Sequence, residues 1–504
     1  MKQVTAAIGA FLLSCSIGYS QEKPPTQIEF APVTREELSH AYMRFDSLLQ
    51  QNPQSPERMI ELNKGFDAVT QKFFTFQLAA ATHDLNELSL SLLPADADRD
   101  AYRVAWSLAT ELSPVELRTD SPDAAIVLRG MYPVTAVAPV SLWVELAPSD
   151  APLLQVTPVL HKVVAMVGSP VQLRLPLKAV FAARENLSIT LSFSADELFE
   201  TRRYLVPRAD PEFFSGPFAR KLATFKDTDG KDAGYQRANA MCAERIKNFS
   251  GTHSAIRSAQ YLLNPKIYER QLYQEIKLLS GGINPYRNRP GDIWRPIISS
   301  KAKYPAVPCR VYVPAALENA VSGSSLGTPL IIALHGAGGD ESMFMDAYGS
   351  GEIKRLADEF NCIVASPSTN ALMLHGAALA DLIDQLSEDF NIDKTRVYVI
   401  GHSMGAGLAS RIAFQRTDIA AAVCIAGGDF AAAAGSRSCP TLVFGAQLDP
   451  LMSAEVLAKK VAAAKAAGHT IEYRLAENQG HTLIVSAKLR ESVEWLLTHT
   501  LATK

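Results

Sequence analysis

The chain has 504 residues, 47% of them hydrophobic, and a formal net charge of −3. This length predicts two to four domains, and the apolar content is ample for buried cores. The small net charge and the lack of a basic cluster argue against nucleic acid as a partner.

The first residues have the pattern of a secretory signal peptide, assigned to residues 1–20. A single positive charge precedes the apolar run Val4–Leu13, which is too short to span a bilayer. Small residues just ahead of Gln21 predict cleavage there. Lipid attachment at Cys15 is the alternative, because the residues before it resemble a lipoprotein box. We therefore expect a secreted or periplasmic protein with no transmembrane segment.

Residues 21–114 are predicted to form an α-helical region. Thr34 followed by Glu37 is a capping box, and Ser55 before a proline begins a second helix. A third helix is expected over about 100–112. Apolar residues recur at helical spacing along the first two helices: Leu38, Tyr42, Phe45, Leu49, Met59, Leu62, Phe66, Val69, Phe73 and Phe76. Such a stripe more often packs in a hydrophobic core than binds a ligand, so we expect these side chains to form a core.

Residues 115–206 change to a period of two, and this predicts a β-sandwich-like module. The stretch Leu142–Leu146 is one example of the alternation. Trp143 and Tyr132 would suit a polysaccharide-binding face, but packing is the commoner role of such aromatic side chains. The role of this module stays open.

Helices are expected to return over residues 207–284, a connecting region. The stretch Gly281–Gly291 is rich in Gly, Pro and Asn and predicts a linker into the last domain, residues 285–504. All candidate catalytic residues lie after this stretch. We therefore expect a chain starting near Ile283 to keep basal activity.

The apolar strand Leu330–Leu334 runs into the glycine-rich loop His335-Gly336-Ala337-Gly338-Gly339. Acyl transfer builds negative charge on a carbonyl oxygen, and backbone N–H groups aimed at that oxygen stabilise it. We assign the N–H of Ala337 to such an oxyanion hole. No Lys-Ser or Lys-Thr follows the glycines, which excludes a P-loop. We expect His335 to fix the loop.

The sequence Gly401-His402-Ser403-Met404-Gly405 matches G-x-S-x-G. The strand pattern 396–400 precedes it, and a helix of small residues, 406–414, follows. This context predicts a nucleophile elbow, with Ser403 exposed on a tight turn. The N–H of Met404, just after the nucleophile, is the second expected oxyanion donor.

A serine nucleophile needs a histidine base, and the base needs an orienting acid. On this type of sheet the chain order is serine, acid, histidine. Asp449 follows the predicted strand 441–445, and His481 follows the strand 471–475. Both residues then lie past the carboxyl ends of adjacent strands, where open α/β sheets place their sites.

Other polar side chains receive lesser roles. Glu477 and Asp429 are the fallback acids, and His402 and His375 are expected to be structural. The chain has no C-x-x-C and no H-E-x-x-H, so neither a metal nor a cofactor is expected.

The cysteines do not form a disulfide framework, because five remain beyond Cys15, an odd and sparse set. Cys362 and Cys424 fall in predicted buried strands and should act as small apolar residues. A bridge between Cys424 and Cys439 is conceivable in an oxidising compartment.

From about residue 285 these motifs resemble the α/β-hydrolase superfamily, whose fold is a mostly parallel sheet with helices on both faces. More narrowly, Val307–Pro314, Pro329–Gly336 and Asp393–Gly405 resemble secreted esterases related to polyhydroxybutyrate depolymerases and feruloyl esterases. The resemblance implies serine chemistry, but it does not identify a substrate, because this fold carries esterases, peptidases and lipases.

The expected function is ester hydrolysis by a secreted serine hydrolase, through a Ser-His-Asp triad and an acyl-enzyme. The substrate is an ester, with an acylated polysaccharide or a polyester among the options, and the oligomeric state stays open. One alternative is a peptidase of the prolyl-oligopeptidase type, which uses the same triad. Another is an envelope-associated binding protein with a vestigial hydrolase fold, against which the complete triad argues.

Overall fold

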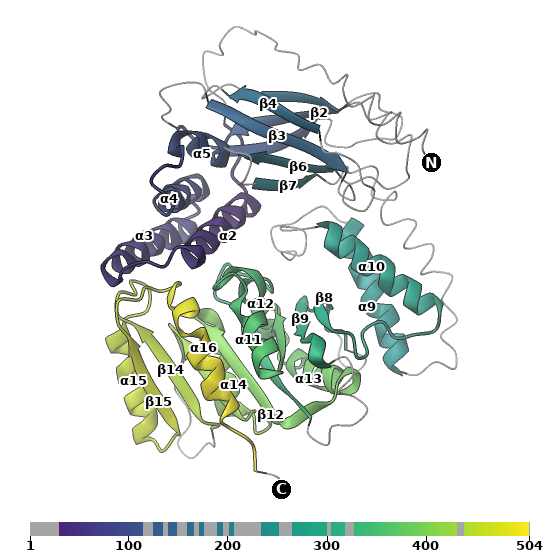
Figure 1. Ribbon diagram of the computed structural model, residues 1–504. Coiled ribbons are helices and arrows are strands. Elements are labelled where there is room, and N and C mark those ends of the chain that lie inside the picture. Colours follow the sequence, from purple (N-terminus) through teal and green to yellow (C-terminus); the bar gives the residue numbers. More distant parts are fainter. Residues whose placement is uncertain are drawn as a thin grey trace.

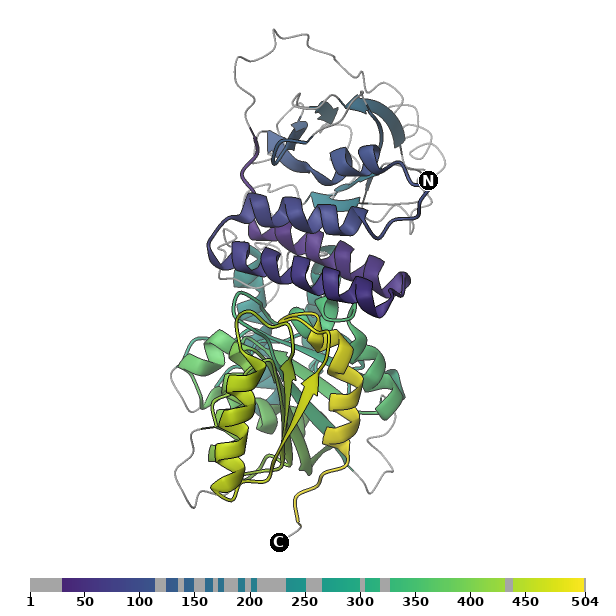
Figure 2. The same ribbon diagram turned by 90° about the vertical axis from the view of Figure 1, so that its left-hand side faces the viewer.

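The structure is a computed structural model. It describes residues 30–113, 124–134, 140–148, 159–165, 171–175, 189–194, 201–205, 233–250, 265–299, 304–317, 327–430 and 438–502. The expected signal segment, 1–20, and Cys15 lie outside the described residues. Figures 1 and 2 show a large sheet flanked by helices at one end, antiparallel strands at the other, and the first helices between them.

The first part is helical, as predicted. Its elements are α2 (Arg35–Gln51), α3 (Pro56–Phe74), α4 (Leu78–Leu90) and α5 (Arg99–Trp106). Both predicted caps are present. The Thr34 hydroxyl accepts the N–H of Glu37 at 3.3 Å, and the Ser55 hydroxyl accepts the N–H of Arg58 at 3.2 Å. These bonds satisfy donors that a helix N-terminus leaves open.

Two elements of this part differ from the prediction. The expected third helix over 100–112 stops at Trp106, and β1 (Leu108–Ser113) follows. The turn between them is held because the Ser107 carbonyl accepts the N–H of Met131 at 2.8 Å. Helix α4 was not predicted because no capping residue marks its start: Gln77 is its N-cap and makes no side-chain capping bond. In both elements tertiary pairing and packing outweigh the local sequence preference.

The β-module contains two antiparallel sheets. One has the order β1–β2–β5, with β2 (Ala124–Gly130) and β5 (Val171–Leu175). The other has the order β4–β3–β6–β7, with β4 (Val159–Ala165), β3 (Val140–Pro148), β6 (Ile189–Ser194) and β7 (Thr201–Leu205). Tyr132 is buried and its hydroxyl bonds the Asn86 amide, so it packs, whereas the side chain of Trp143 lies outside the described residues.

Helices α9 (Ala233–Ser250) and α10 (Pro265–Ser280) precede the large sheet. Side chains of both helices share a buried cluster with Ile293 and Trp294 of the first sheet strand. Arg237 of α9 also pairs with the Glu388 carboxylate at 2.7 Å. The connecting helices therefore contact the last domain through a buried cluster and an ion pair.

The large sheet has eight strands in the order β15–β14–β13–β12–β10–β11–β9–β8. They are β8 (Gly291–Trp294), β9 (Cys309–Val313), β10 (Thr328–Leu334), β11 (Ile363–Pro367), β12 (Ile392–His402), β13 (Ala421–Ile425), β14 (Thr441–Ala446) and β15 (Ile471–Ala476). The strands from β10 to β15 are parallel, and β8 and β9 add an antiparallel edge. The predicted α/β fold class is confirmed.

Helices cover both faces of this sheet (Figure 1). One face packs against α13 (Ala378–Asp389), α14 (Met404–Gln415) and α15 (Ala454–Ala466), and the other against α11 (Glu352–Phe360) and α16 (Ile484–Leu497). Alternate residues of one strand belong to opposite cores: Val399 faces the first cluster and Ile400 the second. Burial on both faces explains why these strands are continuously apolar.

The chain reverses its direction of growth at the centre of the sheet. Strand β10 is followed by β11 on one side and by β12 on the other. A crevice opens at such a switch point, beyond the carboxyl ends of the strands. The loop His335–Gly339 leaves β10 there, and Ser403 follows β12 at the same edge.

Candidate active site

Ser403 has the backbone conformation of a nucleophile elbow. Its φ is 52° and its ψ is −113°, values that a residue with a Cβ adopts only under strain. Its N–H donates to the Ile425 carbonyl at 2.9 Å, which ties the turn to the neighbouring strand. A Cβ on Gly401 or on Gly405 would collide with backbone atoms, so the glycines make the turn possible.

Ser403, His481 and Asp449 lie together in one hydrogen-bonded chain. The Ser403 Oγ is 3.0 Å from Nε2 of His481, and Nδ1 of that ring is 2.7 Å from Oδ2 of Asp449. The N–H groups of Leu451 and Met452 each donate to Oδ1 of Asp449 at 2.8 Å. These bonds orient the carboxylate, which accepts a hydrogen bond from the Nδ1–H of His481. The unprotonated Nε2 then faces the serine hydroxyl.

The two fallback acids are not part of this chain of bonds. Glu477 and Asp429 have exposed side chains, whereas Asp449 and His481 are buried. The N–H of Asp429 donates to the Ser410 hydroxyl at 2.9 Å.

The glycine-rich loop is held by His335, as expected. Its Nδ1 donates to the Gly336 carbonyl at 2.8 Å, and its Nε2 accepts the N–H of Thr369 at 2.9 Å. Burial lowers the pKa of His335 to about 4, so the ring is neutral at pH 7 and Nε2 can accept. Ala337 follows in this loop, on the wall of a pocket that Ser403 also lines. The other expected oxyanion donor, Met404, is the first residue of α14.

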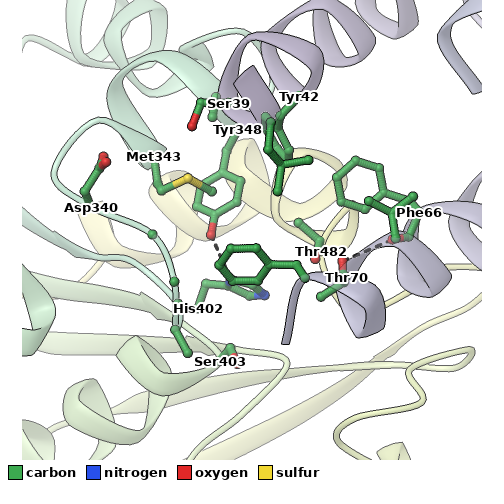
Figure 3. A pocket seen from close by; sticks show the side chains of 18 of the residues that line it. Ser39, Tyr42, Phe66, Thr70, Asp340, Met343, Tyr348, His402, Ser403 and Thr482 are labelled. Carbon is green, nitrogen blue, oxygen red and sulfur yellow. Dashed lines mark hydrogen bonds between the residues drawn. The ribbon is translucent and has the colours of Figure 1, made fainter. Parts of the chain in front are cut away.

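His402 is bonded to the backbone of the His481 loop. Its Nε2 donates to the His481 carbonyl at 2.9 Å, so its Nδ1 accepts from the Tyr348 hydroxyl at 2.8 Å. Figure 3 shows the bond between Tyr348 and His402. Burial lowers the pKa of His402 to about 3, which keeps the ring neutral. His375 stacks on Tyr304 with 5.7 Å between ring centroids, which agrees with the structural role expected for it.

Two residues that the sequence motifs did not identify bond the His481 loop from outside the large sheet. Asp67 on α3 accepts the N–H of His481 with both carboxylate oxygens, at 3.0 and 3.1 Å. Asn63, one turn earlier, accepts the N–H of Gly480 at 2.7 Å and donates to the Asn478 carbonyl at 3.2 Å. The available signal was two polar residues at i and i+4 beside the apolar stripe of this helix. Burial raises the pKa of Asp67 to about 6, although the His481 N–H bond lowers it.

Helix α2 is attached to the same region at two further points. The Asp46 carboxylate accepts the Ser350 hydroxyl at 2.8 Å and also the Ser350 N–H. The Arg35 guanidinium donates to the carbonyl of Gly338 in the glycine-rich loop. Burial raises the pKa of Asp46 to about 6, against the lowering effect of its bonds to Ser350. The first helices are thus bonded directly to the loops of the candidate site.

A pocket of about 150 Å³ lies between these helices and the loops, and Ser403 and His481 line it (Figure 3). The apolar stripe of α2 and α3 was predicted to be core. Phe45 and Leu62 are core, but Phe66 and Phe73 also line the pocket. The prediction is wrong for Phe76 at the far end of the stripe, because this residue lies beyond the helix and is 90% exposed. One apolar helix face can therefore pack against neighbouring side chains and also line a pocket.

Other expectations concern metals, thiols and membranes. Within the described residues no group of three or more His, Cys, Asp or Glu side chains is arranged to hold a metal ion. Cys424 and Cys439 are both buried and free, so the conceivable bridge is not formed. In the same part of the chain, no helix combines the length and apolar character needed to span a bilayer.

Comparison with known sequences finds similarity around the candidate site. A family model described as PET hydrolase-like matches residues 368–488. Cutinase est1 of Thermobifida alba is 35% identical over 97 residues, which is 19% of this chain and 33% of that protein. A cutinase of Thermobifida fusca (strain YX) is 37% identical over 95 residues, 18% of this chain and 31% of that protein. The chain thus spans about a third of the length of the curated relatives it matches.

Solved structures also align with the chain. A thermostable esterase covers 75% of this chain and 95% of its own length, at 14% identity and a TM-score of 0.36. S-formylglutathione hydrolase (FrmB) of Staphylococcus aureus covers 42% and 98%, at 18% identity and a TM-score of 0.34. A feruloyl esterase module of Clostridium thermocellum covers 42% and 90%, at 11% identity and a TM-score of 0.34. The strand order and the sequence similarity to cutinases together confirm the α/β-hydrolase resemblance.

Proposed function

We propose that this α/β-hydrolase-fold protein hydrolyses carboxylic esters with Ser403 as the nucleophile. The observation that carries the proposal is the hydrogen-bonded chain from Ser403 through His481 to Asp449, with the serine on a strained turn. The similarity to cutinases over part of the chain supports an ester rather than a peptide.

In the first half-reaction, the Ser403 oxygen attacks the ester carbonyl carbon while Nε2 of His481 takes its proton. The resulting oxyanion is stabilised by the N–H groups of Ala337 and Met404, and each donor is worth about 3 kcal/mol. The intermediate collapses and His481 gives its proton to the leaving alcohol. Asp449 keeps the ring in the required tautomer and stabilises the imidazolium.

In the second half-reaction, His481 deprotonates a water molecule, which attacks the acyl carbonyl. The carboxylic acid leaves and the Ser403 hydroxyl is restored. His402 contributes by position, because it is neutral and holds the backbone carbonyl of His481. All steps use side chains and backbone amides of this chain.

The test compares the purified protein with Ser403→Ala on p-nitrophenyl butanoate and on aminoacyl p-nitroanilides. Ser387→Ala is the matched control, because that hydroxyl bonds a carbonyl of its own helix. We expect ester turnover in the parent and the control, and a loss of about 10³-fold or more in Ser403→Ala. Cleavage of the anilides in preference to esters would favour the peptidase. No turnover of either substrate would favour the vestigial binding protein.

We also propose export, with residues 1–20 removed before Gln21. The apolar N-terminal run and the small residues before the cleavage position support this. Mass spectrometry of the exported protein distinguishes the two forms. An unmodified chain starting at Gln21 is expected, and a diacylglyceryl group on Cys15 would identify a lipoprotein instead.

A further inference from the structure

The pocket beside Ser403 has two walls from distant parts of the chain. One wall consists of the glycine-rich loop after β10 together with Tyr348 and Thr482. The other consists of side chains from α2 and α3, among them Phe73. Figure 3 shows Tyr42 and Phe66 of this wall. The helices that precede the large sheet therefore contribute to the space beside the nucleophile.

Most side chains of the helical wall are apolar, among them Phe66 and Phe73. Phe66 is 2% exposed, and its ring centroid lies 5.3 Å from that of Tyr42 in an edge-to-face contact. Phe73 reaches the glycine-rich loop, because a Cβ on Gly338 would collide with its ring. The φ of Gly338 is 77°, so a glycine suits this position for its backbone as well. The aromatic wall and the glycine-rich loop thus meet at Gly338.

Several polar side chains that line the pocket have their hydroxyl groups engaged within the protein. The Ser39 hydroxyl donates to the Arg35 carbonyl at 2.8 Å, and that of Thr70 to the Phe66 carbonyl at 3.1 Å. The Tyr348 hydroxyl donates to His402 at 2.8 Å. Because these donors are already used, this part of the wall selects a ligand group that needs no hydrogen bond.

The volume of about 150 Å³ sets the size of that group. A benzene molecule fits an apolar protein cavity of about 150 Å³. Each buried methylene adds about 0.8 kcal/mol to binding, which is roughly a fourfold gain in kcat/KM while space remains.

We propose that this pocket seats one apolar arm of the ester, of about benzene size, and that α2 and α3 thereby set the substrate preference. The arm is the acyl group or the alcohol group, and both present the same chemistry to the wall. This inference rests on the proposed ester hydrolysis.

The test measures kcat/KM by acid release on two ester series. In the first, methyl esters carry acetyl, butanoyl, hexanoyl, phenylacetyl and dodecanoyl groups. In the second, acetates carry alcohols of the same sizes. We expect one series to rise about fourfold per methylene, to peak at the hexyl or phenyl size and to fall at dodecyl. The series that peaks identifies the arm.

Phe73→Ala widens the pocket, and Phe76→Ala is the matched control, since Phe76 is 90% exposed and does not line the pocket. In Phe73→Ala, the ratio of kcat/KM for the ester with the phenyl-sized arm to kcat/KM for the ester with the smallest arm should fall about tenfold. The peak of the series should move to a longer arm. Phe76→Ala should keep the parental profile. A ratio does not depend on how much of the protein is folded. Thr70→Ile is the second variant, and it should move the peak to a shorter arm because it narrows the same pocket.

Two outcomes separate the inference from the proposed function. If no ester is hydrolysed, the proposed function itself fails. If small esters are hydrolysed but both series are flat, or rise steadily to dodecyl, the pocket does not select the arm and the inference is overturned. An unchanged profile in Phe73→Ala and Thr70→Ile would overturn it as well.

Discussion

The backbone N–H of His481 donates to the carboxylate of Asp67, a residue 414 positions earlier in the chain. Asp67 lies on α3, outside the sheet that carries Ser403, His481 and Asp449. We infer that this bond helps to hold the His481 ring in place, and that Asp67 is a positioning residue for the proposed base.

Replacing Asp67 is expected to affect kcat more than KM. In Asp67→Ala the buried N–H of His481 loses its acceptor, at about 1–3 kcal/mol, and the imidazole shifts. A displacement of about 1 Å at a catalytic group can cost about 10²-fold in rate. We predict a 10- to 100-fold loss of kcat, with about the parental KM, at a temperature where circular dichroism shows a folded protein.

Asp67→Asn is the conservative comparison, because its amide oxygen still accepts one N–H. It should recover most of the kcat. Equal kcat values for the parent and Asp67→Ala would show that the bond does not position the base.

The attachment of the helices should weaken as pH rises. Burial raises the pKa of both Asp46 and Asp67 to about 6, from 3.8 in the unfolded chain. Between these values the folded state holds more protons than the unfolded state. The contribution of these two carboxyls to the free energy of unfolding is therefore largest below about pH 4, and it is lost as pH rises through 6. Each carboxyl accounts for at most about 3 kcal/mol.

Thermal unfolding of the parent and of Asp46→Asn/Asp67→Asn between about pH 4 and pH 7 measures this effect. The parent Tm should fall more steeply with rising pH than that of the double variant, which lacks both titrating groups. Parallel curves would show that neither carboxyl has a raised pKa in the folded protein.

That Ser403, Asp449 and His481 lie together could be predicted because their signals are local. Ser403 lies between two glycines at a strand-to-helix turn, and Asp449 and His481 each follow an apolar strand. Strands buried on both faces are continuously apolar, so uninterrupted apolar runs in the sequence located them as well.

The contacts of Asp67 and Asn63 could not be predicted in this way. They depend on how α3 lies against a loop that is distant in sequence, and no local pattern encodes that placement. The pocket beside the aromatic stripe could not be predicted either. The helical period of the stripe indicates a buried face, but it does not show whether a cavity adjoins that face.

The identity of the acid can be tested by substitution. Asp449→Asn should reduce turnover by about 10⁴-fold while the fold persists, because the wrong imidazole tautomer is then favoured. Glu477→Gln and Asp429→Asn are the controls, and both should stay near the parental rate because these side chains are exposed. A collapse in either control, with normal turnover in Asp449→Asn, would reassign the acid.

A chain shortened to start near Ile283 was expected to keep basal activity, and the contacts of the helices reverse that expectation. It would lack Asp67 and the helical wall of the pocket, and it would expose Leu483, which packs in the cluster of the first helices. We predict low solubility and at least a tenfold loss of ester turnover in the soluble fraction, about the effect of one mispositioned group. Full activity in a soluble short chain would mean that the helices only cover the site.

The most direct test of the account is the covalent labelling of the nucleophile by a fluorophosphonate, followed by peptide mass spectrometry. Activated serines react with this probe, whereas ordinary serines do not. We expect a single adduct on the peptide that contains Ser403 and no labelling of Ser403→Ala. Equal labelling of Ser403→Ala, or an unlabelled protein that still hydrolyses esters, would contradict the assignment of Ser403.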